Sequence, residues 1–210
     1  MHHFMFFASL FIVSFSPESH AADKEANAAS ESTCTYQITD AKPGWTAYKT
    51  SDKAPVGGTF NEFQFASAEP AASLSDAIKG LSMSINPASV ESNNAPRNAT
   101  IAGKYFAGFA NPDAISGTVL SVTGDDTAGT VSIQVAMNAV TKDLDFKYTI
   151  GENGALEASA TTDMMDFSLK GPWASLHEAC KALHTGADGV AKTWTEVMLK
   201  VSATVVKNCS

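Results

Sequence analysis

Hydrophobic and polar residues alternate with a period of two along much of this chain. In the segment 129–138 the apolar positions are Val131, Ile133, Val135 and Met137, and small or polar residues lie between most of them. The same alternation recurs in residues 81–85, 143–150 and 197–205. Successive side chains of a β-strand point to opposite faces, so this pattern predicts a sheet with one apolar and one solvent-facing side.

Turn signals divide the alternating segments into eight predicted strands. Asn153-Gly154 is a hairpin signal, and Pro87, Pro112 and Pro172 mark the ends of apolar runs. Eight antiparallel strands joined by short hairpins predict an all-β fold, which is either a closed barrel or a sandwich. The strands are expected near residues 35–49, 58–66, 77–86, 114–123, 129–138, 143–150, 155–164 and 194–206.

Two segments break the alternation and predict short helices. Residues 98–109 place Ile101, Tyr105, Phe106 and Phe109 on roughly one side. Residues 172–184 carry an apolar stripe at helical spacing, which we expect to face the core: Trp173, Leu176, Cys180 and Leu183.

Composition fits one globular domain, expected over residues 34–210. The chain has 210 residues, of which 44% are hydrophobic and 17% charged. Its net charge of −8, with no cluster of Lys or Arg, argues against nucleic acid or an anionic membrane surface as a partner.

The N-terminal residues 1–21 are predicted to be a secretory signal peptide. An apolar run from Phe4 to Phe15 precedes the small-x-small sequence Ser19-His20-Ala21. The alternative is an uncleaved membrane anchor, for which the run is short. Residues 22–33 are small and polar and predict a flexible leader, and no later segment is long enough to span a bilayer. We therefore expect an exported, periplasmic protein.

The three cysteines, Cys34, Cys180 and Cys209, allow one disulfide in an oxidising compartment. In an even-stranded barrel the first and last strands lie side by side, which favours a pair between Cys34 and Cys209. Cys180, on the apolar stripe, would then stay reduced. Pairing of Cys180 with either of the other two remains open.

Residues for catalysis or metal binding are sparse. The sequence has no GxSxG motif and no phosphate-binding loop, and residues 177–181 start like a zinc-protease helix but have Lys181 where a second His is required. Asp163 and Asp166 have no partner His nearby in sequence, and His177 and His184 are interpreted as a polar helix face. We expect no enzyme, no metal and no cofactor.

Aromatic and Met side chains stand out on the predicted inward faces: Phe63, Phe65, Met83, Met137, Phe146 and Tyr148. Periodicity alone leaves two readings, because a small barrel is either filled by its side chains or holds one ligand.

Three blocks resemble the YceI-like family: 56–65, 81–119 and 135–148. The resemblance runs from about residue 36 to 206. It implies a lipocalin-like, eight-stranded antiparallel barrel with one or two short helices. It also implies that the interior binds a polyisoprenoid, an isoprenoid quinone or a similar fatty amphiphile. The expected ligand-binding residues are Phe63, Phe65, Met83, Ile85, Arg97, Ile101, Tyr105, Phe106, Phe109, Val135, Met137, Phe146 and Tyr148.

The chain departs from the family pattern around Arg97, its only arginine. Asn98 and Thr100 replace the family's Asp and His, Tyr105 replaces the first of two Phe, and Ala139 replaces a Gly. The rigid guanidinium of Arg97 suits either a ligand head group or backbone carbonyls that fix its own loop. We favour the structural role, because the charged Asp neighbour is missing.

These observations lead to one main functional hypothesis and two alternatives. The first is an exported carrier that holds a long apolar chain in a cavity of about 300–1,000 Å³. The alternatives are a lipid-acting barrel enzyme and a filled barrel that serves as a stress or adhesion module. The sequence leaves a homodimer open.

Overall fold

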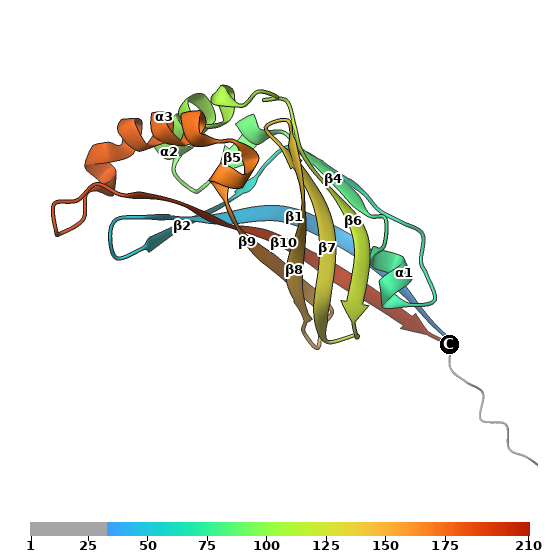
Figure 1. The fold of residues 1–210 in the computed structure, drawn as a ribbon. Coiled ribbons are helices and arrows are strands. Elements are labelled where there is room, and N and C mark those ends of the chain that lie inside the picture. Colours follow the sequence, from blue (N-terminus) through green and yellow to red (C-terminus); the bar gives the residue numbers. More distant parts are fainter. Residues whose placement is uncertain (1–32) are drawn as a thin grey trace, which may run out of the picture. The chain divides into compact units, whose positions relative to one another are not determined.

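The computed structural model describes residues 33–210. Ten antiparallel strands form one strongly curled sheet in the order β3-β4-β6-β7-β8-β9-β10-β1-β2-β5 (Figure 1). The predicted signal peptide and nearly all of the predicted leader lie outside the described residues. The strands are β1 (Cys34–Lys49), β2 (Ala54–Phe60), β3 (Phe63–Ala66), β4 (Ser82–Ile85), β5 (Val90–Glu91), β6 (Ile115–Gly124), β7 (Ala128–Met137), β8 (Val140–Ile150), β9 (Ala155–Asp163) and β10 (Thr193–Cys209).

The all-β prediction is confirmed, but the predicted count of eight strands is wrong. The expected strand 58–66 is broken at Asn61 and Glu62 into β2 and β3. The segment after it is broken by the 3-10 turn Pro87–Ser89 into β4 and β5. Backbone hydrogen bonds across the break, from Asn61 N to Ser89 O (3.0 Å) and from Asn86 N to Glu62 O (2.9 Å), keep the two segments together. The two broken segments therefore supply both edge strands of the sheet, which are β3 at one end of the strand order and β5 at the other.

A short helix, α1 (Leu74–Ile78), replaces the first part of the strand predicted at 77–86. The side chain of Ser73 accepts a hydrogen bond from Asp76 N and caps the helix start, and β4 begins only at Ser82. Leu74, Ala77 and Ile78 are buried, so the helix contributes core residues ahead of the strand. The alternating residues Met83 and Ile85 do lie on β4.

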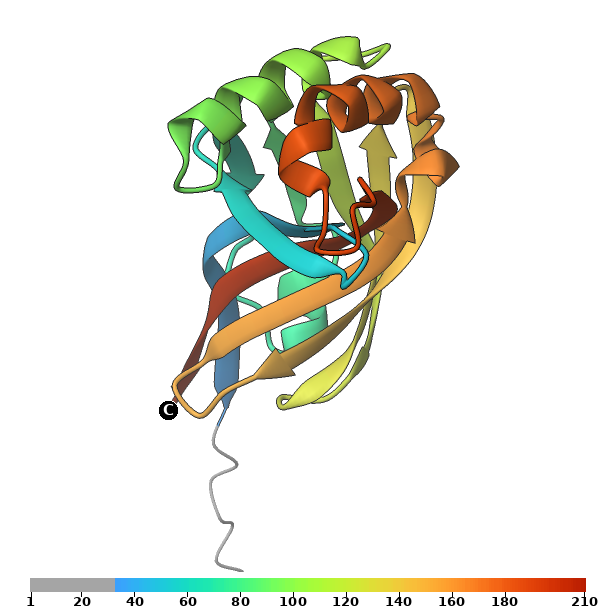
Figure 2. The ribbon, with the colours of Figure 1, turned by 90° about the vertical axis from the view of Figure 1, so that its left-hand side faces the viewer.

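Both predicted helices are present, with shifted bounds, and they cover one end of the curled sheet (Figure 2). α2 (Ala95–Lys104) starts before residue 98 because Asn94 caps it, and the 3-10 turn Phe106–Gly108 follows. α3 (Lys170–Cys180) continues into the 3-10 turn Lys181–His184. The expectation that the α3 stripe faces the core is wrong at Leu183, which is 75% exposed beyond the end of the helix.

The disulfide between Cys34 and Cys209 confirms the favoured pairing, and Cys180 is a free thiol. The two cysteines are register partners at the far ends of β1 and β10, which pair along nearly their whole length. Within residues 33–210, no helix combines the length and the apolar character needed to cross a bilayer.

Candidate ligand-binding site

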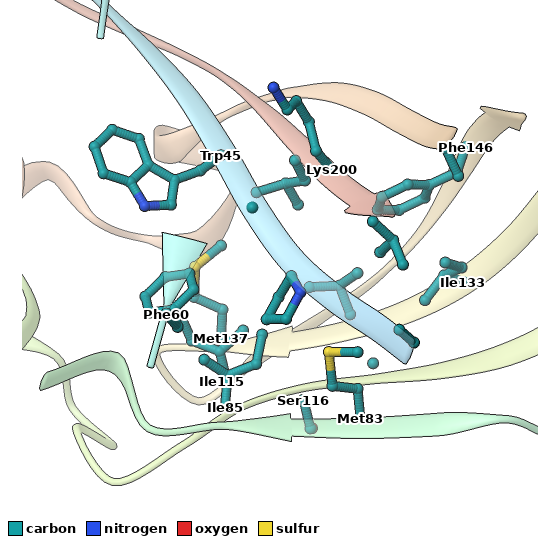
Figure 3. Close-up of a pocket in the computed structure, with 18 of the residues that line it drawn as sticks. Trp45, Phe60, Met83, Ile85, Ile115, Ser116, Ile133, Met137, Phe146 and Lys200 are labelled. Carbon is teal, nitrogen blue, oxygen red and sulfur yellow. The ribbon is translucent and has the colours of Figure 1, made fainter. Parts of the chain in front are cut away.

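The inner face of the curled sheet surrounds an apolar cavity of about 240 Å³ (Figure 3). This volume is smaller than the expected 300–1,000 Å³, but it is more than tenfold the roughly 10–15 Å³ that one water needs. A packing defect is far smaller, so the interior is not filled by its own side chains.

Period-two alternation explains how the strands supply the wall. All four apolar positions singled out on the segment 129–138 line the cavity: Val131, Ile133, Val135 and Met137. β10 contributes in the same way through alternate residues, which are Val197, Leu199, Val201 and Ala203. The sheet therefore places one apolar side chain in the wall for every two residues of strand.

The structure brings nine of the thirteen expected site residues together around this cavity. They are Phe65, Met83, Ile85, Ile101, Tyr105, Phe106, Val135, Met137 and Phe146. The other four, Phe63, Arg97, Phe109 and Tyr148, are not among the residues that line it.

Two of these four residues, Phe109 and Tyr148, are buried although they do not line the cavity. Phe109 lies in an aromatic cluster, 5.2 Å from the ring centre of Tyr105 and 5.3 Å from that of Phe106. Tyr148 donates a hydrogen bond of 2.8 Å from its hydroxyl to Asp125 O in the turn between β6 and β7. Phe109 thus packs against two residues of the cavity wall, and Tyr148 holds the turn between β6 and β7.

Arg97 holds its own loop. Its Nε donates to Ser92 Oγ and one terminal nitrogen donates to Ser92 O, both at 2.9 Å. Asn98 Oδ1, at the position where the family has Asp, accepts from Ser92 N (2.9 Å) and Ser92 Oγ (2.6 Å). Ser92 is buried, so its hydroxyl and its backbone groups are shielded from solvent and need partners within the protein. Arg97 and Asn98 supply these partners. The contacts agree with the structural alternative for Arg97.

Sequence reasoning missed the contribution of β1 to the wall. Ile38 faces the cavity, and so do Ala41, Pro43, Trp45 and Ala47, so the inward phase changes from even to odd residue numbers. The β1–β10 register shifts between Thr39 and Lys42, where Asp40 adopts a positive φ of 54°. Such a bulge inserts one residue and reverses the inward phase of the strand. The alternation could not be recognised across this position.

Polar side chains in the wall are few, and Lys200 is the only charged residue among the described residues that line the cavity. The lining side chains with hydrogen-bonding groups are those of Trp45, Tyr105, Ser82, Ser116 and Lys200. Figure 3 shows the amino end of Lys200 directed away from the other labelled side chains. Burial raises the pKa of Tyr105, so its hydroxyl stays neutral. Within residues 33–210, no group of three His, Cys, Asp or Glu side chains is placed to hold a metal ion. The cavity therefore favours the binding of an uncharged chain.

Comparison with known proteins places this geometry in context. A 135-residue stretch is 34% identical to a UPF0312 protein of Pseudomonas putida and covers 57% of this chain and 67% of that protein. The structure resembles BcnA of Burkholderia cenocepacia, with a TM-score of 0.57 at 15% identity over 79% of this chain and 96% of that one. It also resembles a polyisoprenoid binding domain from Saccharophagus degradans, with a TM-score of 0.54 at 13% identity over 83% of this chain and 98% of that one.

The match to a family model decides the classification. Residues 27–205 match the YceI-like domain, which includes every strand except the last residues of β10. The curled sheet, its apolar interior and this match agree with the resemblance found in the sequence. The chain belongs to the YceI-like family.

Proposed function

We propose that this protein is an exported carrier that binds the apolar chain of an amphiphile in the interior of its sheet. One observation carries the proposal, which is a cavity whose wall consists almost entirely of aliphatic and aromatic side chains. Transfer of a hydrocarbon chain from water into such a cavity gains about 25 cal/mol for each Å² of apolar surface removed from water. A polyisoprenoid, an isoprenoid quinone or another fatty amphiphile fits this chemistry.

The relatives and the disulfide support the same proposal. One protein of similar fold is named for polyisoprenoid binding. The Cys34–Cys209 disulfide is typical of proteins that leave the reducing cytosol, which supports export to the periplasm. The predicted signal peptide in residues 1–21 supplies the route.

The two alternative functions have less support. A filled barrel would leave no cavity of this size. An enzyme that acts on lipids needs an acid and a base close to the bound chain, and the lining side chains contain no carboxylate and no imidazole. Binding without chemical conversion is therefore the favoured function.

Lipid extraction and native mass spectrometry of protein purified from bacterial periplasm test the proposal. We expect one amphiphile per chain, and the same spectrum reports whether the protein is a monomer or the homodimer that the sequence left open. Phe146→Arg should abolish this binding, because Phe146 is only 3% exposed and faces the cavity. Asp145→Arg is the matched control, since Asp145 precedes Phe146 on β8 but is exposed.

A second variant guards against misfolding of the arginine variant. Ala158→Phe fills the cavity from β9 without adding a charge, and it should reduce binding while circular dichroism shows an intact sheet. Unchanged binding in folded Phe146→Arg and Ala158→Phe proteins would locate the ligand elsewhere and overturn the proposal.

A further inference from the structure

Trp45 differs from the other two tryptophans of the chain in one respect. The indole nitrogen of Trp173 donates to Thr193 O at 3.3 Å, and that of Trp194 donates to Thr50 O at 2.9 Å. The nitrogen of Trp45 has no hydrogen-bond partner, and it is the only buried side-chain nitrogen or oxygen in residues 33–210 that lacks one. Leaving such a donor unpaired in the protein interior is unfavourable, because the group has lost its bond to water without gaining another.

The side chain of Trp45 belongs to the wall of the candidate site. Trp45 is 9% exposed and lies in the cavity wall, between Leu199 of β10 and Gly58 of β2 in the sheet register. A Cβ at Gly58 would lie 2.6 Å from Cζ2 of Trp45, so the indole packs directly over this glycine. Only glycine leaves room for the ring here, and the close packing fixes the ring in the wall.

A second neutral polar group belongs to the same side of the cavity. Phe60 lies two residues beyond Gly58 on β2, and its ring centre is 5.8 Å from that of Phe106, which is 5.1 Å from that of Tyr105. Tyr105 is 6% exposed, and burial alone raises the pKa of its hydroxyl. Figure 3 shows Trp45 and Phe60 on one side and Phe146 and Ile133 on the other. Trp45 and Tyr105 thus add two neutral polar groups to a wall whose other uncharged polar side chains are Ser82 and Ser116.

We propose that Nε1 of Trp45 donates the hydrogen bond that holds the head group of the bound amphiphile. The head group is uncharged and carries an acceptor oxygen, such as a carbonyl. A bound anion would need a cationic partner to offset its loss of hydration. The guanidinium of Arg97 is bound to Ser92, and the amino end of Lys200 points away from the cavity. The indole N–H is a donor only, so it selects an acceptor.

The nitrogen of Trp45 is covered by its neighbours. The proposal therefore requires one side chain of the wall to move aside when the head group binds. A hydrocarbon without a head group has no atom that could form this bond. The inference rests on the proposed function, since it requires a chain in the cavity, and it adds the chemistry of the head group to it.

Three probes with the same decyl chain test the inference: a decyl benzoquinone, decylbenzene and decyl phosphate. In 15N-labelled protein the three tryptophans give three indole signals. We expect the quinone to shift the Trp45 signal toward the position of a hydrogen-bonded indole, and decylbenzene to leave it without that shift. Decyl phosphate should bind more weakly than the quinone.

Substitutions turn the same experiment into a measurement of affinity. Trp45→Phe keeps an aromatic ring but removes the donor, and it should weaken quinone binding about three- to tenfold while decylbenzene binding is unchanged. Trp194→Phe is the matched control, because it removes an indole N–H that is bonded to Thr50 outside the cavity wall. It should leave both affinities unchanged.

Equal shifts of the Trp45 signal with quinone and decylbenzene would overturn the inference and leave the proposed function standing. So would unchanged quinone affinity in Trp45→Phe, or tighter binding of decyl phosphate. Failure of the folded wild-type protein to bind any of the three probes would overturn the proposed function itself, and the inference with it. If Trp45→Phe does not fold, the inference is still tested by the wild-type protein, through the difference between the Trp45 signal shifts with the quinone and with decylbenzene.

Discussion

The two ends of the curled sheet are closed by different kinds of interaction. At the end that holds the chain terminus, the Cys34–Cys209 disulfide joins β1 to β10. Close to it, Asp126 in the turn between β6 and β7 accepts hydrogen bonds from Tyr36 Oη (2.7 Å) and Lys207 Nζ (2.8 Å). At this disulfide end, a covalent bond thus joins the neighbouring strands β1 and β10, and an ion pair connects β10 to the turn between β6 and β7.

The opposite end, here called the helix end, is covered by α2, α3 and their 3-10 turns (Figure 2). Neither helix has a fully buried residue, although Tyr105, Phe106 and Phe109 after α2 are buried. Much of the attachment is by single side chains. The amide of Asn138, for example, donates to Phe167 O (2.8 Å) and accepts from Ala110 N (2.6 Å).

This difference indicates which end opens. Segments with few buried contacts open locally at a small fraction of the global unfolding free energy. At the disulfide end the covalent bond keeps β1 and β10 paired and Asp126 holds the β6–β7 turn against them, whereas the helix end requires only a few hydrogen bonds and aromatic contacts to separate. We therefore expect ligands to enter and leave at the helix end, and stability and ligand exchange to respond separately to changes at the two ends.

Removal of the disulfide should give the largest loss of stability. The bond closes a loop across a sequence separation of 175 residues, which corresponds to about 5 kcal/mol in the chain-entropy model. We expect urea unfolding of the Cys34→Ser, Cys209→Ser double variant to show a decrease of about 3–5 kcal/mol. Ligand affinity should stay within about twofold of wild type, because the site lies elsewhere.

Cys180→Ser is the control for this comparison. Cys180 is a free, partly buried thiol near the helix end, and its replacement should change the free energy of unfolding by less than about 1 kcal/mol. Complete loss of ligand affinity in a folded disulfide-free variant would contradict the independence of the two ends.

Asn138→Ala should be the most disruptive single change at the helix end. It removes three hydrogen bonds from a residue that is 8% exposed, and it places alanine at a positive φ of 53°. We expect a decrease of about 2–4 kcal/mol in unfolding free energy. Stopped-flow measurements should also show faster release of a fluorescent fatty probe. The reason is that the segments around Ala110 and Phe167, at the helix end, lose their hydrogen bonds to Asn138.

Asn138→Gly separates the two causes. Glycine accepts the positive φ without strain but lacks the amide, so release should be as fast as in Asn138→Ala while stability is partly restored. Release rates equal to those of the wild-type protein in both variants would show that the hydrogen bonds of Asn138 do not keep the helix end closed.

Arg97→Lys should have a smaller effect. The guanidinium makes two bonds to Ser92 that a single ammonium group cannot reproduce in the same geometry. We expect a loss of about 1–2 kcal/mol in thermal or urea unfolding, with unchanged affinity for decyl benzoquinone. A fall in affinity at unchanged stability would instead show that Arg97 binds the head group.

Much of the sheet could be predicted from alternation and turns, because both are local properties of the sequence. The strands β6 to β10 follow the expected segments closely. The errors lie where tertiary contacts decide the local structure. The kink at Asn61 and Glu62 depends on hydrogen bonds to Ser89 and Asn86, and α1 depends on the capping hydroxyl of Ser73.

The candidate site, too, could be predicted only where the local alternation of the sequence is regular. Residues on regular strands, such as Met137 and Phe146, were identified correctly as inward-facing. Trp45 was missed because the bulge near Asp40 reverses the phase of β1, which no pattern of period two reveals. His177 and His184, interpreted as a polar helix face, in fact converge on the hydroxyl of Thr193 at 3.0 and 2.6 Å. Such a contact depends on the path of the chain between α3 and β10.

That contact gives the smallest predicted effect, which is a difference in how the two ends respond to acid. Burial lowers the pKa of His184 below its ordinary 6.5, and the positive charges of Lys49 and His177 lower it further. The unfolded chain then binds the proton more readily than the folded one, so this contribution to stability is complete above about pH 6.5 and is lost as the pH falls below it. At the disulfide end, hydrogen bonds from Lys207 and Tyr36 lower the pKa of Asp126 below 3.8, so that contribution persists until the pH falls below about 3.8.

Between pH 7 and pH 5 only the helix end should weaken. His184 is only partly buried and solvent screens its charge, so the change should be small in global unfolding and clearer in the rate of ligand release. We expect faster release of a fatty probe at pH 5 than at pH 7 in the wild-type protein, and a flatter dependence in His184→Gln. The same acceleration in His184→Gln as in wild type would assign the response to another group.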